Sequence, residues 1–259
     1  MFTQDFKKLI AARFFFVFAV EMQAVIVGWQ IYELLKDPLS LGLIGLTEAA
    51  PALGLALIAG YVVDRSRPLK VYRSVLQISL ISALVVLIPQ IMPGHFSAHG
   101  EALMLYLASF LTGAARAFSQ PSIFAVVPRI VKRENLPQSS ALMSSTMQVA
   151  RIAGPAFGGI VFGWIGMTVS AYLVCLILVL SLICHALIKI QIGAPARTRH
   201  QSVTEELLSG VKFVFGHPIL LPSMTLDMIS VLFGGVTALL PIFAKEILMV
   251  GAKGLGALR

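Results

Sequence analysis

The sequence predicts an all-α integral membrane protein, and its composition and its apolar runs support this prediction. Hydrophobic residues make up 58% of the chain and charged residues only 12%, against about 25% charged residues in soluble domains. Apolar runs of roughly 20 residues, long enough to cross about 30 Å of hydrocarbon as helices, recur along the chain. The run "YLVCLILVLSLICHALI" is apolar on every face, whereas strands of a membrane barrel alternate polar and apolar residues. The spans are therefore expected to be helices.

Seven spans are expected, the first of them a retained helix. It follows Lys7 and Lys8, and no small-residue cleavage site comes after it, which argues against a removable signal peptide. Pro51 and Gly54 in the second span, and the glycines from Gly154 onward in the fifth, permit kinks and close helix contacts. Helix packing alone explains these residues equally well. The spans lie near residues 10–35, 40–63, 70–91, 102–127, 138–163, 166–189 and 219–244.

The basic residues predict a cytoplasmic amino terminus. With that orientation fourteen Lys and Arg residues flank the spans on the cytoplasmic side, and only Lys36, Lys245 and Lys253 lie outside. This bias is the positive-inside rule, and basic loops beside anionic lipid explain the net charge of +8 without a nucleic-acid partner. The fourteen are Lys7, Lys8, Arg13, Arg65, Arg67, Lys70, Arg73, Arg129, Lys132, Arg133, Lys189, Arg197, Arg199 and Lys212.

Two motifs resemble those of the major facilitator superfamily. The stretch Gly60-Tyr-Val-Val-Asp64-Arg65 matches the start of the family's G-x-x-x-D-R-x-G-R-K loop between helices two and three, although Arg67 and Pro68 depart from it. The stretch "ARIAGPAFGG" in the fifth span resembles the family's antiporter motif G-x-x-x-G-P-x-x-G-G, with Ala150 in place of the first Gly. The matching residues of this second motif are Gly154, Pro155, Gly158 and Gly159. The wider pattern is similar to the branch of siderophore exporters and macrolide-efflux proteins.

The resemblance implies a twelve-helix fold built from two six-helix halves. Residues 1–190 then correspond to the amino-terminal six-helix bundle, and residues 191–218 to a cytoplasmic linker with an amphipathic helix from about 202 to 215. Residues 219–259 correspond to the first helix of the carboxy-terminal bundle. We therefore expect a truncated chain, an amino-terminal half plus helix seven, whose partners are the missing carboxy-terminal helices or a second polypeptide.

The loop after the second span gathers Gly60, Asp64, Arg65, Arg67 and Lys70, here called the latch loop. In the family the carboxylate of this motif bonds to the neighbouring Arg and lies close to a helix end of the other half, where it helps to hold the outward-facing state. A carboxylate near a helix amino terminus gains from the dipole and the unpaired N–H groups there. The alternative is a surface Asp–Arg pair contributing less than about 1 kcal/mol.

Five charged residues lie inside the predicted spans, roughly 10 Å or more from the nearest helix end at about 1.5 Å per residue. An unpaired charge at that depth costs at least about 2.5 kcal/mol, so such groups face a cavity or one another. They are therefore candidates for a proton and substrate pathway, and the alternative is a set of structural ion pairs. The five are Glu21, Glu48, Arg116, Arg151 and Asp227.

These observations predict a secondary transporter in the inner (plasma) membrane. The expected activity is proton-coupled export of a small molecule, drug-like or siderophore-like, by alternating access. The alternative is that the chain is a non-transporting truncated remnant or an accessory half-transporter. The sequence has no P-loop, Gly-x-Ser-x-Gly or His-Glu-x-x-His, so we expect no enzymatic activity. No cofactor and no metal site are expected, since His95, His99 and Glu101 fall beside Pro and Gly in an outer loop.

The predicted topology can be tested with reporter fusions. Fusions at Pro68, Lys132 and Gln201 should report a cytoplasmic position, and fusions at Pro38, Ser97 and Gly166 an external one, because the basic loops stay on the cytoplasmic side. A cytoplasmic signal from Ser97 would contradict this orientation.

Overall fold

A computed structural model describes residues 2–190, 192–193, 212–233, 240–250 and 254. Every regular element in these ranges is helical, which confirms the all-α prediction. Helices occupy the positions of the first six expected spans. They are α1 (Gln4–Leu35), the pair α2 (Pro38–Gly54) and α3 (Ala56–Arg65), α4 (Pro68–Ile91), α5 (Ala98–Ile130), α6 (Leu136–Ile165) and α7 (Met167–Ala186). The 3₁₀ turn η1 (Arg133–Asn135), α9 (Leu220–Phe233), α10 (Leu240–Ile242) and the π-helical turn η3 (Phe243–Ile247) complete the described elements.

The helix ends follow from local sequence. The Thr3 side chain caps α1 by accepting from the Phe6 amide at 3.3 Å, and Asp37 caps α2 directly before Pro38 at its first turn. Ser97 caps α5 in the same way. The turn between α6 and α7 consists of Gly166 at φ +89°, a backbone conformation that strongly favours glycine. These caps and turns allow the long helices to run antiparallel with short connections.

The second span is broken. α2 and α3 meet at Leu55 with a bend of 43°, close to Pro51 and Gly54. Proline removes a backbone donor and clashes with the preceding turn, and glycine weakens the helix interior. The kink that the sequence permits is therefore present, and it divides the expected span into two helices.

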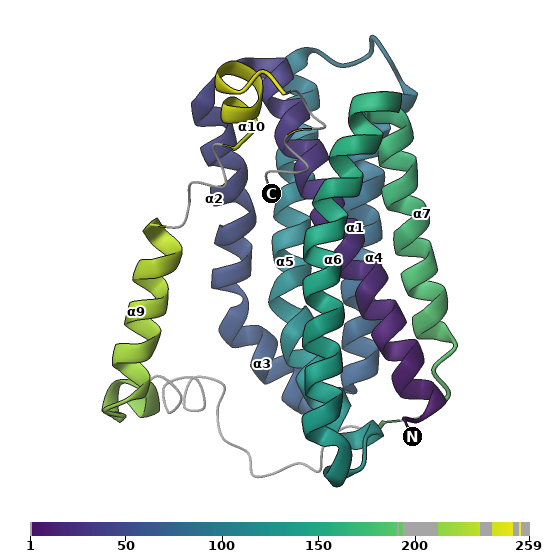
Figure 1. Ribbon diagram of the computed structural model, residues 1–259, viewed down its shortest axis with the longest axis vertical. Helices are drawn as coiled ribbons and strands as arrows, with labels where there is room; N and C mark the ends of the chain where they lie inside the picture. Colours follow the sequence, from purple (N-terminus) through teal and green to yellow (C-terminus); the bar gives the residue numbers. More distant parts are fainter. Residues whose placement is uncertain (1, 191, 194–211, 234–239, 251–253, 255–259) are drawn as a thin grey trace.

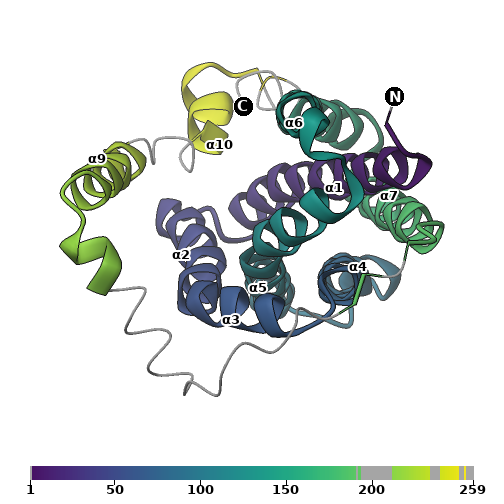
Figure 2. The same cartoon turned by 90° about the horizontal axis from the view of Figure 1, so that it is seen from below.

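α1 is the central helix of the bundle. It packs most extensively against α6 and α7, and α5 packs against α2, α3 and α4. The end view in Figure 2 shows α1 and α5 surrounded by the other helices, and Figure 1 shows α1 beginning at the same end of the bundle where α7 ends. Fully buried apolar residues such as Leu9, Met22, Leu76 and Leu178 form the core. This arrangement brings one face of α1 against α5 and α6.

The apolar character of the helices varies. α1, α4, α5 and α7 are each long and apolar enough to cross a membrane, and the bent pair α2–α3 is a fifth such segment. α6 has 30 residues but is not among these membrane-length apolar helices, and serines, glycines and Arg151 interrupt its apolar residues. Among the described residues the membrane-length apolar segments are therefore fewer than the seven expected spans.

The segment expected to form the seventh span is only partly described. α9 covers its first half, stands apart from the bundle in Figures 1 and 2, and has exposed side chains from Pro222 to Ser230. Residues 234–239 lie outside the described residues, and so do residue 191 and residues 194–211 of the expected linker, which include most of its predicted amphipathic helix.

Polar contacts tie α1 to its neighbours on the side of the core. The Gln23 amide donates to Ser82 Oγ of α4 at 2.9 Å and reaches Thr112 Oγ1 of α5 at 3.4 Å. Ser181 of α7 donates to the Ala12 carbonyl at 2.6 Å. These groups are buried, and buried polar groups that find partners in this way fix the register of packed helices.

A second set of contacts joins the start of α1 to the end of α7. The Asp5 carboxylate accepts from the amides of Lys189 and Ile190 at 3.2 and 3.1 Å. Lys8 Nζ donates to the Leu187 carbonyl at 2.7 Å. Lys8 thus satisfies a carbonyl at the end of α7, and Asp5 satisfies two amides of the segment that follows.

Glycines of the antiporter-like motif lie against α1. A Cβ on Gly154 would lie 2.7 Å from the Phe18 carbonyl oxygen and 3.1 Å from Glu21 Cβ. A Cβ on Gly158 would lie 2.9 Å from Met22 Cγ. The motif thus permits close approach of α6 and α1 beside Glu21, as small residues do in membrane helix pairs.

We predict that Gly154→Ala destabilises the protein by about 1–3 kcal/mol, because the added methyl group overlaps backbone that cannot rotate away. Gly60→Ala is the matched control, since a Cβ there meets nothing within 4 Å, and alanine in a helix favours stability by up to about 1 kcal/mol. Thermal unfolding in detergent compares the two. Equal midpoints would contradict the close packing at Gly154.

Candidate functional site

A cleft of about 190 Å³ opens on one side of α1, between α5 and α6. Four of its lining residues carry charge, which is unusual at membrane depth. The remaining wall is apolar or neutral, so the cleft presents a few charges on a mostly apolar surface. Its lining residues are Arg13, Phe16, Val17, Val20, Glu21, Arg116, Ser119, Gln120, Met147 and Arg151.

Arg116 of α5 bridges two carboxylates from two other helices. Its Nη2 lies 3.3 Å from Glu21 Oε1 of α1, and its Nη1 lies 3.1 Å from Glu48 Oε1 of α2. The side chains of Glu21 and Glu48 are 17% and 23% exposed, and that of Arg116 is 36% exposed. The structure therefore brings three of the five predicted intramembrane charges together as one group, here called the Arg116 bridge.

The position of Glu48 depends on Gly113, which sequence reasoning missed. A Cβ on Gly113 would overlap the Glu48 carbonyl oxygen and lie 2.9 Å from Pro51 Cγ. Only glycine lets the backbones of α2 and α5 approach this closely. Since Gly113 precedes Arg116 by three residues, nearly one helical turn, the same contact places the Glu48 carboxylate beside the guanidinium.

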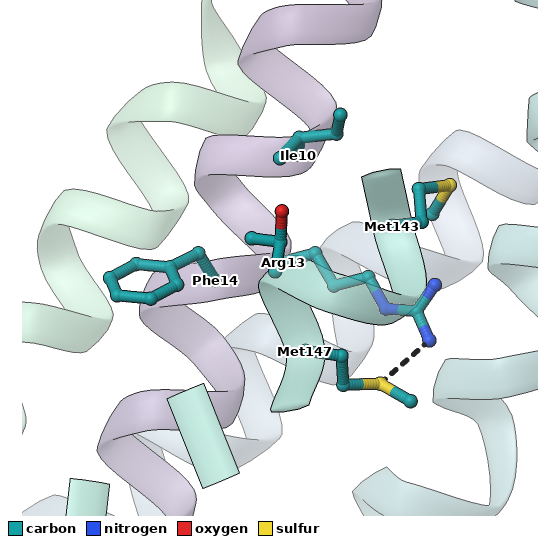
Figure 3. A pocket seen from close by; sticks show the side chains of 6 residues that line it. Ile10, Arg13, Phe14, Met143 and Met147 are labelled. Atoms are coloured by element: carbon teal, nitrogen blue, oxygen red, sulfur yellow. Dashed lines mark hydrogen bonds between the residues drawn. The ribbon is translucent and has the colours of Figure 1, made fainter. Parts of the chain in front are cut away.

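Arg13 has a different role from the one expected. The charge pattern groups it with the basic residues that flank the spans on the cytoplasmic side. The helix α1 begins at Gln4, however, so Arg13 lies more than two turns inside it and is only 7% exposed. Its Nη2 donates to Gln120 Oε1 and contacts Met147 Sδ at 3.0 Å. Figure 3 shows the guanidinium extending from α1 toward Met143 and Met147 of α6, with Phe14 on the other side.

The last two predicted pathway residues do not join the Arg116 bridge. Arg151 is exposed at the cleft and makes no ion pair within the described part of the chain. Asp227 lies on α9 and is exposed as well. The structure thus places four of the five predicted charges on or beside one cleft and leaves Asp227 away from them.

The latch loop lies at the end of α3, on the outside of the bundle. Asp64 is exposed and has no hydrogen bond or ion pair among the described residues, and Arg67 and Lys70 are exposed. The Arg65 guanidinium stacks over the Tyr61 ring, 4.4 Å from its centroid. A Cβ on Gly60 would meet nothing within 4 Å. The described residues therefore leave the Asp64 carboxylate accessible to another element.

Sequence periodicity could have identified more of the cleft. On α5, Arg116, Ser119 and Gln120 follow a spacing of three and four residues, and Met147 and Arg151 of α6 are four apart. Residues at such spacings share one face of a helix. Gln120 and Met147 were missed because nothing in the sequence distinguishes a neutral cleft residue from the other neutral residues of an apolar span.

A double-mutant cycle tests the Arg116 bridge. Arg116→Gln should lower the free energy of unfolding by about 1–2 kcal/mol, a modest value because the guanidinium is partly exposed and screened. Glu21→Gln should lower the free energy of unfolding less in the Arg116→Gln variant than in the unmodified protein. The difference, which is the coupling energy, should be about 1 kcal/mol. The same cycle with Glu134, an exposed residue of η1, should be additive. Additive effects at Glu21 would mean that the two side chains do not interact.

Comparison with known proteins assigns the family. Enterobactin exporter EntS of Shigella boydii serotype 18 is 25% identical to this chain over 96% of the chain and 58% of that protein. Enterobactin exporter EntS of Escherichia coli O1:K1 / APEC is 24% identical with the same coverage, so the chain spans less than two thirds of the length of these relatives. The profile of the Major Facilitator Superfamily matches residues 9–258. With its apolar helices and this match, the chain is a multi-pass membrane protein that belongs to the Major Facilitator Superfamily.

Proposed function

We propose that the protein is a proton-coupled secondary transporter that exports a small molecule by alternating access. The family and the similarity to enterobactin exporters support transport and efflux, and a siderophore-like compound is the first substrate to test. The bundle α1–α7 fits the six-helix half expected for the family. In this proposal residues 1–190 form one bundle, residues 191–218 the linker, and residues 219–259 begin the second bundle.

The Arg116 bridge is the observation that carries the proton-coupling proposal. One guanidinium that lines the cleft is shared by two carboxylates from different helices, and one of these, Glu21, also lines the cleft. A proton added to either carboxylate removes a negative charge and weakens its hold on Arg116. Because the partners sit on α1, α2 and α5, protonation shifts the favoured arrangement of these helices. This links a proton gradient to opening and closing of the cleft.

The proposal also gives the latch loop and the antiporter-like motif their roles. Asp64 is accessible at the end of α3, where it can accept from the amino terminus of a helix in the second bundle. Gly154 and Gly158 of the antiporter-like motif let α6 lie against α1 at the level of Glu21, and in this proposal the motif, with Pro155 and Gly159, keeps the two helices together beside the cleft. The proposal includes a cytoplasmic amino terminus and the inner (plasma) membrane as the location, and the basic loops support this orientation.

Transport in proteoliposomes with an imposed pH gradient tests this function, with enterobactin as the first substrate. Glu21→Gln and Glu48→Gln should retain substrate binding but lose uptake driven by the gradient, because an amide cannot change its charge. Substrate inside the vesicles is measured by mass spectrometry, and proton movement by a trapped pH dye.

Glu134→Gln is the matched control, since Glu134 is exposed in η1 away from the cleft, and it should transport like the unmodified protein. Gradient-driven uptake that persists in both Glu21→Gln and Glu48→Gln would leave the Arg116 bridge a structural feature. Enterobactin uptake that ignores the gradient in every variant would contradict proton coupling altogether.

A further inference from the structure

The cleft carries more positive than negative charge among the described residues. Arg13, Arg116 and Arg151 line it, and Glu21 is the one carboxylate in its lining. Glu48 reaches Arg116 from α2. Counting both carboxylates against the three guanidinium groups leaves one excess positive charge. That excess is not on Arg116, because both carboxylates lie within 3.3 Å of its guanidinium.

The excess charge belongs to Arg13 and Arg151. The contacts of the Arg13 guanidinium are an amide oxygen and a thioether, which accept hydrogen bonds but bring no negative charge. Arg13 is 7% exposed, and a buried cation without a counter-charge is costly. Arg151 lies at the same cleft and has no ion pair within the described ranges. Neither guanidinium has an ion-pair partner in the described ranges, so the net positive charge of the cleft lies on this pair.

The walls around these two groups are apolar. Phe16, Val17 and Val20 of α1 and Met147 of α6 line the same cleft. A ligand that fits this surface has a compact apolar body and one anionic group. Guanidinium groups bind carboxylates, phosphates and similar oxyanions through charge-assisted hydrogen bonds, which are among the stronger polar contacts in proteins.

We propose that Arg13 and Arg151 form a subsite for an anionic group on an apolar substrate, separate from the Arg116 bridge that exchanges protons. This rests on the proposed transport function and adds the chemical class of the ligand. The two groups have different roles because Arg116 is paired with Glu21 and Glu48. Arg13 and Arg151 have no carboxylate partner among the described residues and can donate hydrogen bonds to an oxyanion. A cationic substrate is disfavoured at this cleft by the same charges.

A charge series of one molecular shape tests the subsite. Benzoate, benzamide and benzylamine have similar bodies and carry negative, neutral and positive charge at neutral pH. Dissociation constants are measured by ligand-observed NMR with the purified protein in nanodiscs, without any gradient. Benzoate should bind at least about tenfold more tightly than the other two, since a charge-assisted bond contributes that much discrimination.

Variants assign the preference to the cleft. Arg151→Gln should weaken benzoate binding by about tenfold, Arg151→Lys should retain most of it, and benzamide should be little affected. Arg129→Gln is the matched control, because it removes the same charge from the end of α5, where Arg129 donates to the Gly193 carbonyl at 3.0 Å outside the cleft. It should leave benzoate binding unchanged.

Two results would overturn the subsite. The first is the absence of a benzoate preference, including no binding of any of the three compounds, which would mean that Arg13 and Arg151 do not bind an anionic group. The second is an equal loss of benzoate affinity in Arg151→Gln and Arg129→Gln. This would mean that the net charge of the protein, and not the cleft, determines benzoate binding. Because the measurement uses no gradient, a failure of proton-coupled transport does not alter its outcome.

Discussion

Arg116 lies on α5 inside the membrane-length part of the bundle, where a guanidinium is costly unless opposite charge compensates it. The structure provides that charge twice, from Glu21 on α1 and Glu48 on α2. Three helices are thereby held at one point by electrostatics, and the cleft opens beside that point. The other features of the site, namely the glycine contacts, the kink and the position of Arg13, determine how closely these groups approach.

Close backbone approach and charge pairing depend on each other here. Gly113 allows α2 to lie against α5, and Gly154 allows α6 to lie against α1 beside Glu21. Without these contacts the carboxylates would stand farther from Arg116, and attraction falls with distance. Glycines in membrane helices are usually explained by packing alone. In this bundle the packing also fixes the separation of the charged groups.

The sequence predicted the helical class, the family and most of the charged residues of the cleft, because charges within apolar runs are conspicuous. It did not predict which of them pair, since pairing depends on how helices far apart in sequence pack. Arg13 was assigned to the membrane boundary because the predicted first span begins near residue 10, whereas the helix begins at Gln4. The amphipathic helix expected near residues 202–215 falls mostly outside the described residues.

The two sides of α1 differ in a way that bears on how such a bundle moves. On its core side Gln23 is bonded to α4 and α5, and the Ala12 carbonyl is bonded to α7. On its cleft side it contributes Glu21, held by the Arg116 bridge, and Arg13, bonded to a neutral side chain. Hydrogen bonds between neutral buried groups do not gain or lose charge when a proton is added, whereas a carboxylate paired with a guanidinium loses its charge. Under the proposed function, protonation therefore acts on the cleft side and leaves the core side intact, and the bundle responds by changing its cleft face as a unit.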